Sequence, residues 1–168
     1  MRKLVSAGLA LVLMSGTALA GEIGDQLPQA LYDGTVAQLT EDAGVACLAG
    51  EGEACFAIGI DAIISAYEEL AQDLYRHGAV VPDASTFGVM MGLGVDSEPS
   101  GNPNPEPLTY EMLREMLDMF TARLDNAATY MRLAGEGTDF VIRVEPLKVR
   151  MDLNGDGALE LVFSSFDR

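Results

Sequence analysis

The residues of this chain best suited to chemistry lie near its end, in the stretch MDLNGDGALELVF, residues 151–163. Asp152, Asn154, Asp156 and Glu160 occupy the first, third, fifth and ninth places of a loop, and the carbonyl of Ala158 occupies the seventh. Calcium prefers oxygen ligands of these kinds, and a glycine at the sixth place favours the sharp turn that gathers them. Carboxylates drawn together to about 4 Å would repel by roughly 4 kcal/mol a pair, so a closed loop requires a cation. An open loop does not, and the stretch is then a plain polar β-turn.

The same stretch resembles the calcium loops of EF-hand and dockerin proteins, and its trailing ELVF is similar to the D-x-N-G-D-G-x-x-E-L-V-x loops of FG-GAP (integrin-type) repeats. This resemblance implies side-chain ligation by Asp152, Asn154, Asp156 and Glu160. The resemblance covers about a dozen residues, and the motif occurs once in the chain. At the twelfth place, where an EF-hand has a bidentate Glu, this sequence has Phe163. We therefore expect weak calcium binding, with a Kd of about 10⁻⁴ to 10⁻³ M as in extracellular modules.

The two cysteines, Cys47 and Cys55, flank the Gly-rich segment LAGEGEA. In an exported protein, two thiols this close favour a disulfide over two buried thiols, and the bond would stabilise the fold by roughly 2.5 kcal/mol. A nucleophilic role for a thiol has little support, since no partner carboxylate is identifiable and the chain has a single histidine.

That histidine, His77, is either a metal ligand or general base, or more simply a cation at the end of a helix, four residues after Asp73. Three methionines, Met112, Met116 and Met119, contain thioethers that bind Cu(I), but methionines at helical spacing more often fill gaps in a core. We assign no catalytic residue, and the sequence favours a protein that is not an enzyme.

The first 20 residues have the order of a secretory signal peptide: Arg2 and Lys3, an apolar run, and the small-x-small site Ala18-Leu19-Ala20. The alternative is an uncleaved amphipathic or anchoring segment. The apolar run is shorter than the roughly 20 residues that span a bilayer. We expect residues 1–20 to be removed and residues 21–168 to be exported, with a bacterial-type signal, to the periplasm or the medium.

The charge of the exported part would be strongly negative. The chain has 10 basic and 26 acidic residues, and residues 1–20 hold two of the basic ones and none of the acidic ones, so the remainder carries −18. Phosphate backbones and anionic lipids would repel it, which argues against nucleic acid and membranes as partners and leaves a basic protein or a cation. The acidity is equally explained by solubility alone.

Two long amphipathic helices dominate the rest of the sequence. Apolar residues recur at helical spacing within 53–78 and within 108–137, with Thr109 as a cap and Gly78 and Gly135 as ends. The apolar stripe of the second helix includes Leu117, and in the first helix Glu68 and Gln72 fall on the side opposite the stripe. One or two shorter helices are expected within 24–50, interrupted at Pro28 and Gly34, and another after Asp83. Residues 95–107 should form an exposed loop, and alternating residues on both sides of 152–160 predict strands.

The fold predicted is therefore mainly α: a small helical bundle in one domain, residues 21–168, with a short C-terminal β strand-loop-strand unit. Three classes of function remain. The first is an exported, calcium-binding scaffold or binding protein with an acidic surface. The second is a carboxylate-dependent hydrolase, and the third is a structural helical protein in which the loop is inert.

Overall fold

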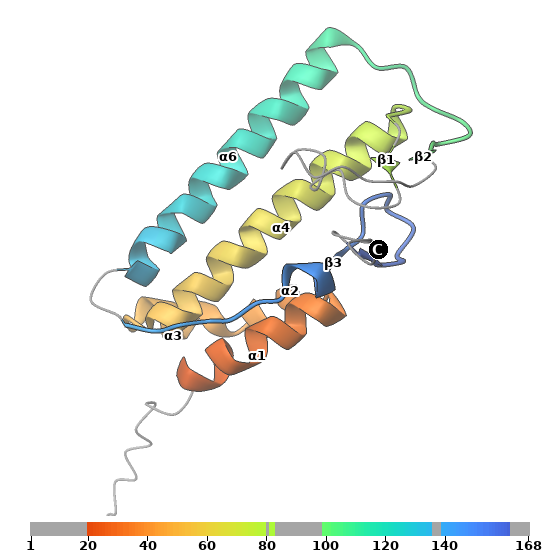
Figure 1. Ribbon diagram of the computed structural model, residues 1–168. Helices are drawn as coiled ribbons and strands as arrows, with labels where there is room; N and C mark the ends of the chain where they lie inside the picture. Colours follow the sequence, from red (N-terminus) through yellow and green to blue (C-terminus); the bar gives the residue numbers. More distant parts are fainter. Residues whose placement is uncertain (1–19, 80, 83–98, 136–138, 162–168) are drawn as a thin grey trace, which may run out of the picture.

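The computed structural model describes residues 20–79, 81–82, 99–135 and 139–161. Its two longest helices are α4 (Gly52–Arg76) and α6 (Tyr110–Gly135). They lie side by side and run in opposite directions (Figure 1). Between them the rings of Tyr67 and Phe120 meet edge to face, with centroids 5.1 Å apart. The predicted mainly α architecture, with a pair of long helices, is confirmed.

Three shorter helices pack around the first half of α4 (Figure 1): α1 (Ala20–Asp33), α2 (Val36–Thr40) and α3 (Ala43–Leu48). Their apolar side chains form the main core with α4. Leu27 of α1 is fully buried there, and Ala57 of α4 is buried beside it. Burial of these faces stabilises helices that are too short to be stable alone.

The prediction that Pro28 interrupts the first helix is wrong, because Pro28 lies inside α1. Proline removes one hydrogen bond within a helix and crowds the preceding turn. Leu27, Ala30 and Leu31 all bury their side chains in the core, and this packing keeps the segment helical across the proline. The helix ends before Gly34, whose φ of 66° only glycine adopts without strain.

The ends of the long helices follow the sequence signals. The backbone N–H of Met112 donates to Thr109 Oγ1 at 3.2 Å, which confirms the predicted cap of α6. At the end of α4, Gly78 has φ 88° and the N–H of Ala79 donates to the carbonyl of Leu74, so the helix ends in the expected left-handed turn. Residues 101–107, which follow β2, are exposed except for Asn102, which is half-buried.

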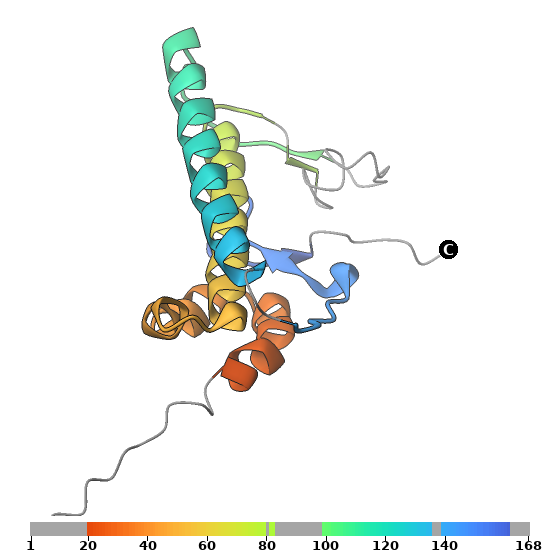
Figure 2. The same cartoon turned by 90° about the vertical axis from the view of Figure 1, so that its left-hand side faces the viewer.

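The C-terminal part returns along the helical body and then forms the predicted strand-loop-strand unit. A 3-10 turn, η1 (Pro146–Lys148), precedes β3 (Arg150–Met151), which pairs antiparallel with β4 (Glu160–Leu161). The unit lies on the side of α4 away from α6 (Figures 1 and 2). A second short ladder pairs β1 (Val81–Pro82) with β2 (Pro99–Ser100).

Alternation predicted that Leu147, Val149, Met151 and Leu153 share one buried face, and this is only partly right. Met151 and Leu153 are buried, whereas Leu147 is 49% exposed. The reason is Pro146, which starts the 3-10 turn and breaks the two-residue period before the strand begins.

Two other expectations concern the remaining segments. The short helix expected after Asp83 lies outside the described residues. In the described part of the chain, none of the helices has the length and apolar character needed to cross a membrane.

Candidate metal site

The loop that connects β3 and β4, at the turn of the hairpin, contains most of the predicted calcium ligands. Met151 pairs with Glu160 across the ladder, so residues 152–159 form the connection. Gly155 and Gly157 have φ values of 78° and 82°, a conformation that side chains with a Cβ rarely adopt. These two glycines let the chain turn back sharply within a few residues.

Hydrogen bonds inside the loop converge on its carboxylates. Asp152 accepts the N–H of Gly155 on Oδ1 at 2.7 Å and the N–H of Gly157 on Oδ2 at 3.1 Å. Asp156 Oδ1 accepts the N–H of Ala158 at 2.7 Å. The loop is therefore wound around the Asp152 carboxylate, whose oxygens each have a second lone pair for a ligand.

The third-place side chain joins the same group. Asn154 Oδ1 accepts the N–H of Asp156 at 2.9 Å, and Asn154 Nδ2 donates to Asp156 Oδ2 at 3.1 Å. The structure thus joins Asn154 and Asp156 directly, and it places both in the loop that closes on the Asp152 carboxylate. Oxygens from two carboxylates and an amide suit a hard cation such as Ca²⁺, so the residues present fit the ion that the resemblance implies.

The other two predicted ligands are placed less fully. Ala158 is exposed at the seventh place of the loop. Glu160 begins β4 opposite Met151, and its side chain lies outside the described part. Within the described residues, no three side chains of the His, Cys, Asp or Glu type form a group that could hold a metal ion.

Side chains of helix α4 form hydrogen bonds with the first residue of the loop. The N–H of Asp152 donates to Glu68 Oε1 at 2.8 Å, and Gln72 Nε2 donates to the carbonyl of Asp152 at 2.7 Å. On either side of Asp152, Met151 and Leu153 are 3% and 2% exposed and pack against α4. The base of the loop is therefore fixed to the helical body by polar and apolar contacts together.

The amphipathic pattern of the sequence places Glu68 and Gln72 on the side of the helix opposite its apolar stripe, but gives no sign that this side is covered. Both are half-buried, because α4 is covered by α6 on one side and by the C-terminal unit on another. The only available signal was their spacing of four residues, which puts them on one helix face. Nothing in that spacing identifies a partner about 80 residues away.

At the edge of the loop, Leu159 contacts the end of α1. A Cβ built on Gly34 would lie 2.5 Å from Leu159 Cδ1, so the glycine is what allows this side chain to approach. The aliphatic residue at the eighth place of the loop thus provides a second contact with the helical body, although Leu159 is still 38% exposed.

His77 is a cap residue at the end of α4. Its Nδ1 lies 3.2 Å from the carbonyl oxygen of Glu106, and the Glu106 N–H donates to the carbonyl of Arg76. The neighbouring Arg76 pairs with Asp73 at 2.8 Å. These contacts connect the segment after β2 to the end of α4. They support the alternative in which His77 has a structural role at the helix end.

The three methionines of α6 do not act alike. Met116 is buried at 8% exposure and fills a gap in the core, as predicted. Met119 is 47% exposed, so the expectation that it fills the core is wrong, and so is the placement of Leu117, 46% exposed, in the apolar stripe. Among the helices and strands that the structure describes, α4 makes by far the most extensive contact with α6, and the stripe that it buries is narrower than the apolar pattern of the sequence.

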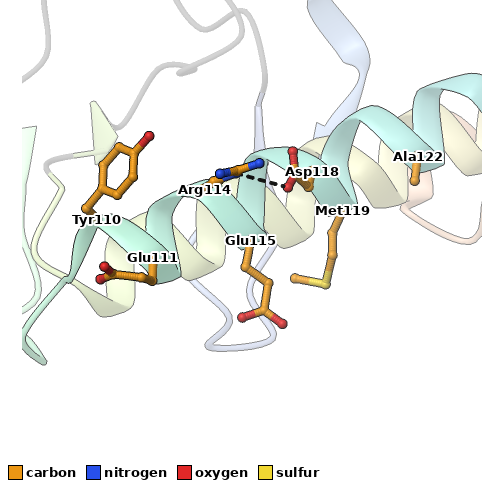
Figure 3. A pocket seen from close by; sticks show the side chains of 7 residues that line it. All are labelled: Tyr110, Glu111, Arg114, Glu115, Asp118, Met119 and Ala122. Carbon is orange, nitrogen blue, oxygen red and sulfur yellow. Dashed lines mark ion pairs between the residues drawn. The ribbon is translucent and has the colours of Figure 1, made fainter.

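A surface hollow of about 590 Å³ follows one face of α6 (Figure 3). All seven lining residues come from that single helix: Tyr110, Glu111, Arg114, Glu115, Asp118, Met119 and Ala122. Arg114 Nε lies 3.7 Å from Asp118 Oδ2, while Glu115 and Met119 point away from this pair (Figure 3). The hollow is a shallow helix surface on which no carboxyl group faces another across a cleft.

The carboxyl group of Asp61, which is not part of this hollow, has a perturbed pKa. Burial raises the pKa of Asp61 on α4 above its ordinary value, and a hydrogen bond from Thr40 partly offsets that rise. Thr40 Oγ1 lies 3.0 Å from Asp61 Oδ2. Asp61 is not among the residues that line the hollow on α6. Its carboxyl group has a structural partner in Thr40.

Comparison with protein-family models, with curated proteins and with solved structures gives no match for this chain.

Proposed function

We propose that this chain is an exported, acidic protein whose loop 152–160 binds one calcium ion weakly and whose helical body serves as a scaffold or binding surface. The observation that supports the proposal is a loop that contains Asp152, Asn154 and Asp156 and is wound around the Asp152 carboxylate. Such a loop holds negative charge in a small volume, and a bound cation relieves the repulsion. Ala158 and Glu160 would complete the ligand set through a carbonyl and a carboxylate.

The proposed partner of the helical body is a basic protein. The chain has 26 acidic residues against 10 basic ones, and the excess is available for long-range attraction of a positively charged surface. The signal-type segment 1–20 supports a periplasmic or extracellular location, where calcium at millimolar concentration suits a weak site. A hydrolase is not proposed, since the carboxyl groups that line the hollow on α6 all come from one helix and do not face one another across a cleft.

The test is calcium titration by isothermal calorimetry, together with thermal unfolding in Ca²⁺, in Mg²⁺ and in chelator. Linkage predicts a stabilisation of about 1.4 kcal/mol at tenfold excess over Kd and about 2.7 kcal/mol at a hundredfold excess. Asp152→Ala and Asp156→Ala should abolish both the binding heat and the stabilisation.

Asp125→Ala is the matched control, because Asp125 is exposed on α6 and its removal changes the net charge by the same amount. This variant should behave like the wild type. If Ca²⁺ gives no heat and no stabilisation in the wild type, the loop is an inert polar turn and the proposal fails. If Mg²⁺ stabilises the wild type equally, the effect is not specific to calcium and the proposal of a calcium site fails as well.

A further inference from the structure

One residue of the candidate calcium loop has both of its own peptide groups held by a distant helix. The N–H of Asp152 donates to Glu68 Oε1 at 2.8 Å, and the carbonyl of Asp152 accepts from Gln72 Nε2 at 2.7 Å. Glu68 and Gln72 are one turn apart on α4 and precede Asp152 by 84 and 80 residues. Asp152 is the first-place ligand and the residue around which the loop is wound.

Apolar packing fixes the same point of the chain. Met151 and Leu153, the neighbours of Asp152, are buried against α4 with Ala71 at the centre of the cluster. Gln72 also contacts the loop beyond Asp152, since its Cδ would lie 3.6 Å from a Cβ on Gly155. The backbone at the first place of the loop is therefore held from both sides, whereas Gly155, Asp156, Gly157 and Ala158 are exposed.

We infer that Glu68 and Gln72 are positioning residues of the calcium site, so that ion binding and the docking of the C-terminal hairpin on α4 are one coupled equilibrium. The inference rests on the proposed function. An EF-hand closes its loop with a bidentate Glu at the twelfth place, and this chain has Phe163 there. Here the contacts from α4 hold the backbone of Asp152, and with it the start of its side chain, in place before the ion arrives, which lowers the cost of ordering the ligands.

The coupling works in both directions. Calcium that binds the docked loop more tightly than the undocked loop must favour docking by the same factor. Calcium would then fasten the hairpin, and through it the Leu159 contact with the end of α1, onto the helical body. A calcium-dependent position of the C-terminal unit is the expected consequence.

The experiment measures calcium Kd by calorimetry and the melting temperature in chelator for the full protein and five variants. Gln72→Met removes the donor to the Asp152 carbonyl at similar length, and Glu68→Ala removes the acceptor. Both should raise the Kd by about tenfold, the lower end of the loss typical when support around a metal ligand is removed. Glu68→Gln keeps an acceptor oxygen at the same place and should recover most of the wild-type affinity.

Two controls separate positioning from general stability. Glu69→Ala removes the adjacent carboxylate, which forms an ion pair with Arg123 of α6 on the other side of the helix. Gln26→Met makes the Gln72 substitution at an exposed position of α1. Both controls should bind calcium within about twofold of the wild type, whatever they do to the melting temperature.

The outcomes are distinct. If the wild type binds calcium and Gln72→Met and Glu68→Ala bind it equally well, with only the melting temperature in chelator reduced, the two residues are structural and the inference fails while the proposed function stands. If the wild type shows no calcium binding, both fail. If Gln72→Met does not fold, the comparison of Glu68→Ala with Glu68→Gln decides, and equal affinities there overturn the inference.

Discussion

Two turns of this molecule are each closed by residues a few positions apart, but they are joined to the helical body in different ways. The corner between α3 and α4 is closed by the Cys47–Cys55 disulfide, with an S–S distance of 2.06 Å and a Cα–Cα distance of 4.7 Å. The loop between β3 and β4 is closed by hydrogen bonds around the Asp152 carboxylate. The corner is itself part of the helices that it joins, whereas the loop depends on contacts with a helix about 80 residues away.

This difference decides which forces stabilise each region. A disulfide acts mainly on the unfolded chain, whose freedom it reduces whether or not the folded corner packs well. The loop has no covalent closure, so its order depends on the burial of Met151 and Leu153 and on the polar contacts from Glu68 and Gln72. Substitutions at its base should therefore cost more than substitutions at its tip.

The largest effect is expected at the base of the loop. Leu153 is 2% exposed, and Leu153→Ala should lower the free energy of unfolding by about 3 kcal/mol, because it removes buried apolar area and leaves a cavity. Leu159→Ala is the matched control in the same loop, and because Leu159 is 38% exposed it should cost about 1 kcal/mol. Urea unfolding in chelator measures both, and equal losses would contradict the view that docking depends on Leu153.

A slightly smaller effect is expected at the corner. Replacing both cysteines by alanine should lower the free energy of unfolding by about 2.5 kcal/mol, the chain-entropy value for so short a loop. For a domain of this size the melting temperature should fall by about 5 to 10 °C. Reductant should produce a similar fall in the wild type and none in the double variant.

The corner experiment also bears on the loop. If the two regions are independent, the double cysteine variant should keep the wild-type calcium Kd, because additivity holds for distant sites without shared partners. A weaker Kd would show that the corner and the loop are coupled through α4, and the contrast drawn between them would then need revision.

The same contrast explains how much the sequence could predict. The disulfide was predictable, because two cysteines so close in the sequence form a local pattern, and it is confirmed. The Asp-x-Asn-x-Asp-Gly spacing predicted a loop between two strands, but the sequence left open whether that loop closes as a metal site or is a plain polar turn. The long helices and the Thr109 and Gly78 signals were predictable for the same reason, and the fold class followed from them.

What the sequence could not predict are contacts between segments far apart. Helical periodicity assigned Glu68 and Gln72 to the side opposite the apolar stripe, and such a pattern gives no sign of a hairpin that covers this side with hydrogen bonds. For Met119 and Leu117 the error is the opposite: the sequence predicted burial, and both are about half exposed. Periodicity marks a wide apolar face, and only tertiary packing decides how much of that face is covered. Pro28 was misplaced because burial of its neighbours outweighs its low helical propensity.

The smallest effect is expected between the two regions, at Asp61, whose partner Thr40 is 21 residues away. Burial raises the pKa of the Asp61 carboxyl, so folding favours its protonated form. The charged form therefore lowers the free energy of unfolding at pH values above the raised pKa, and this loss of stability disappears below the ordinary value of 3.8. Asp61→Asn keeps an oxygen for Thr40 and removes the charge, so at pH 7 it should be equal to or more stable than the wild type, by about 0.5 kcal/mol at most because water screens a half-exposed group. Urea unfolding at pH 7 and below pH 4 should show this difference vanish as the pH falls.

A variant that is clearly less stable at pH 7 would show that the bond from Thr40 to the charged carboxylate outweighs the cost of burial. The contact of α2 with α4 would then resemble the base of the loop, where polar contacts across long sequence distances hold the structure together.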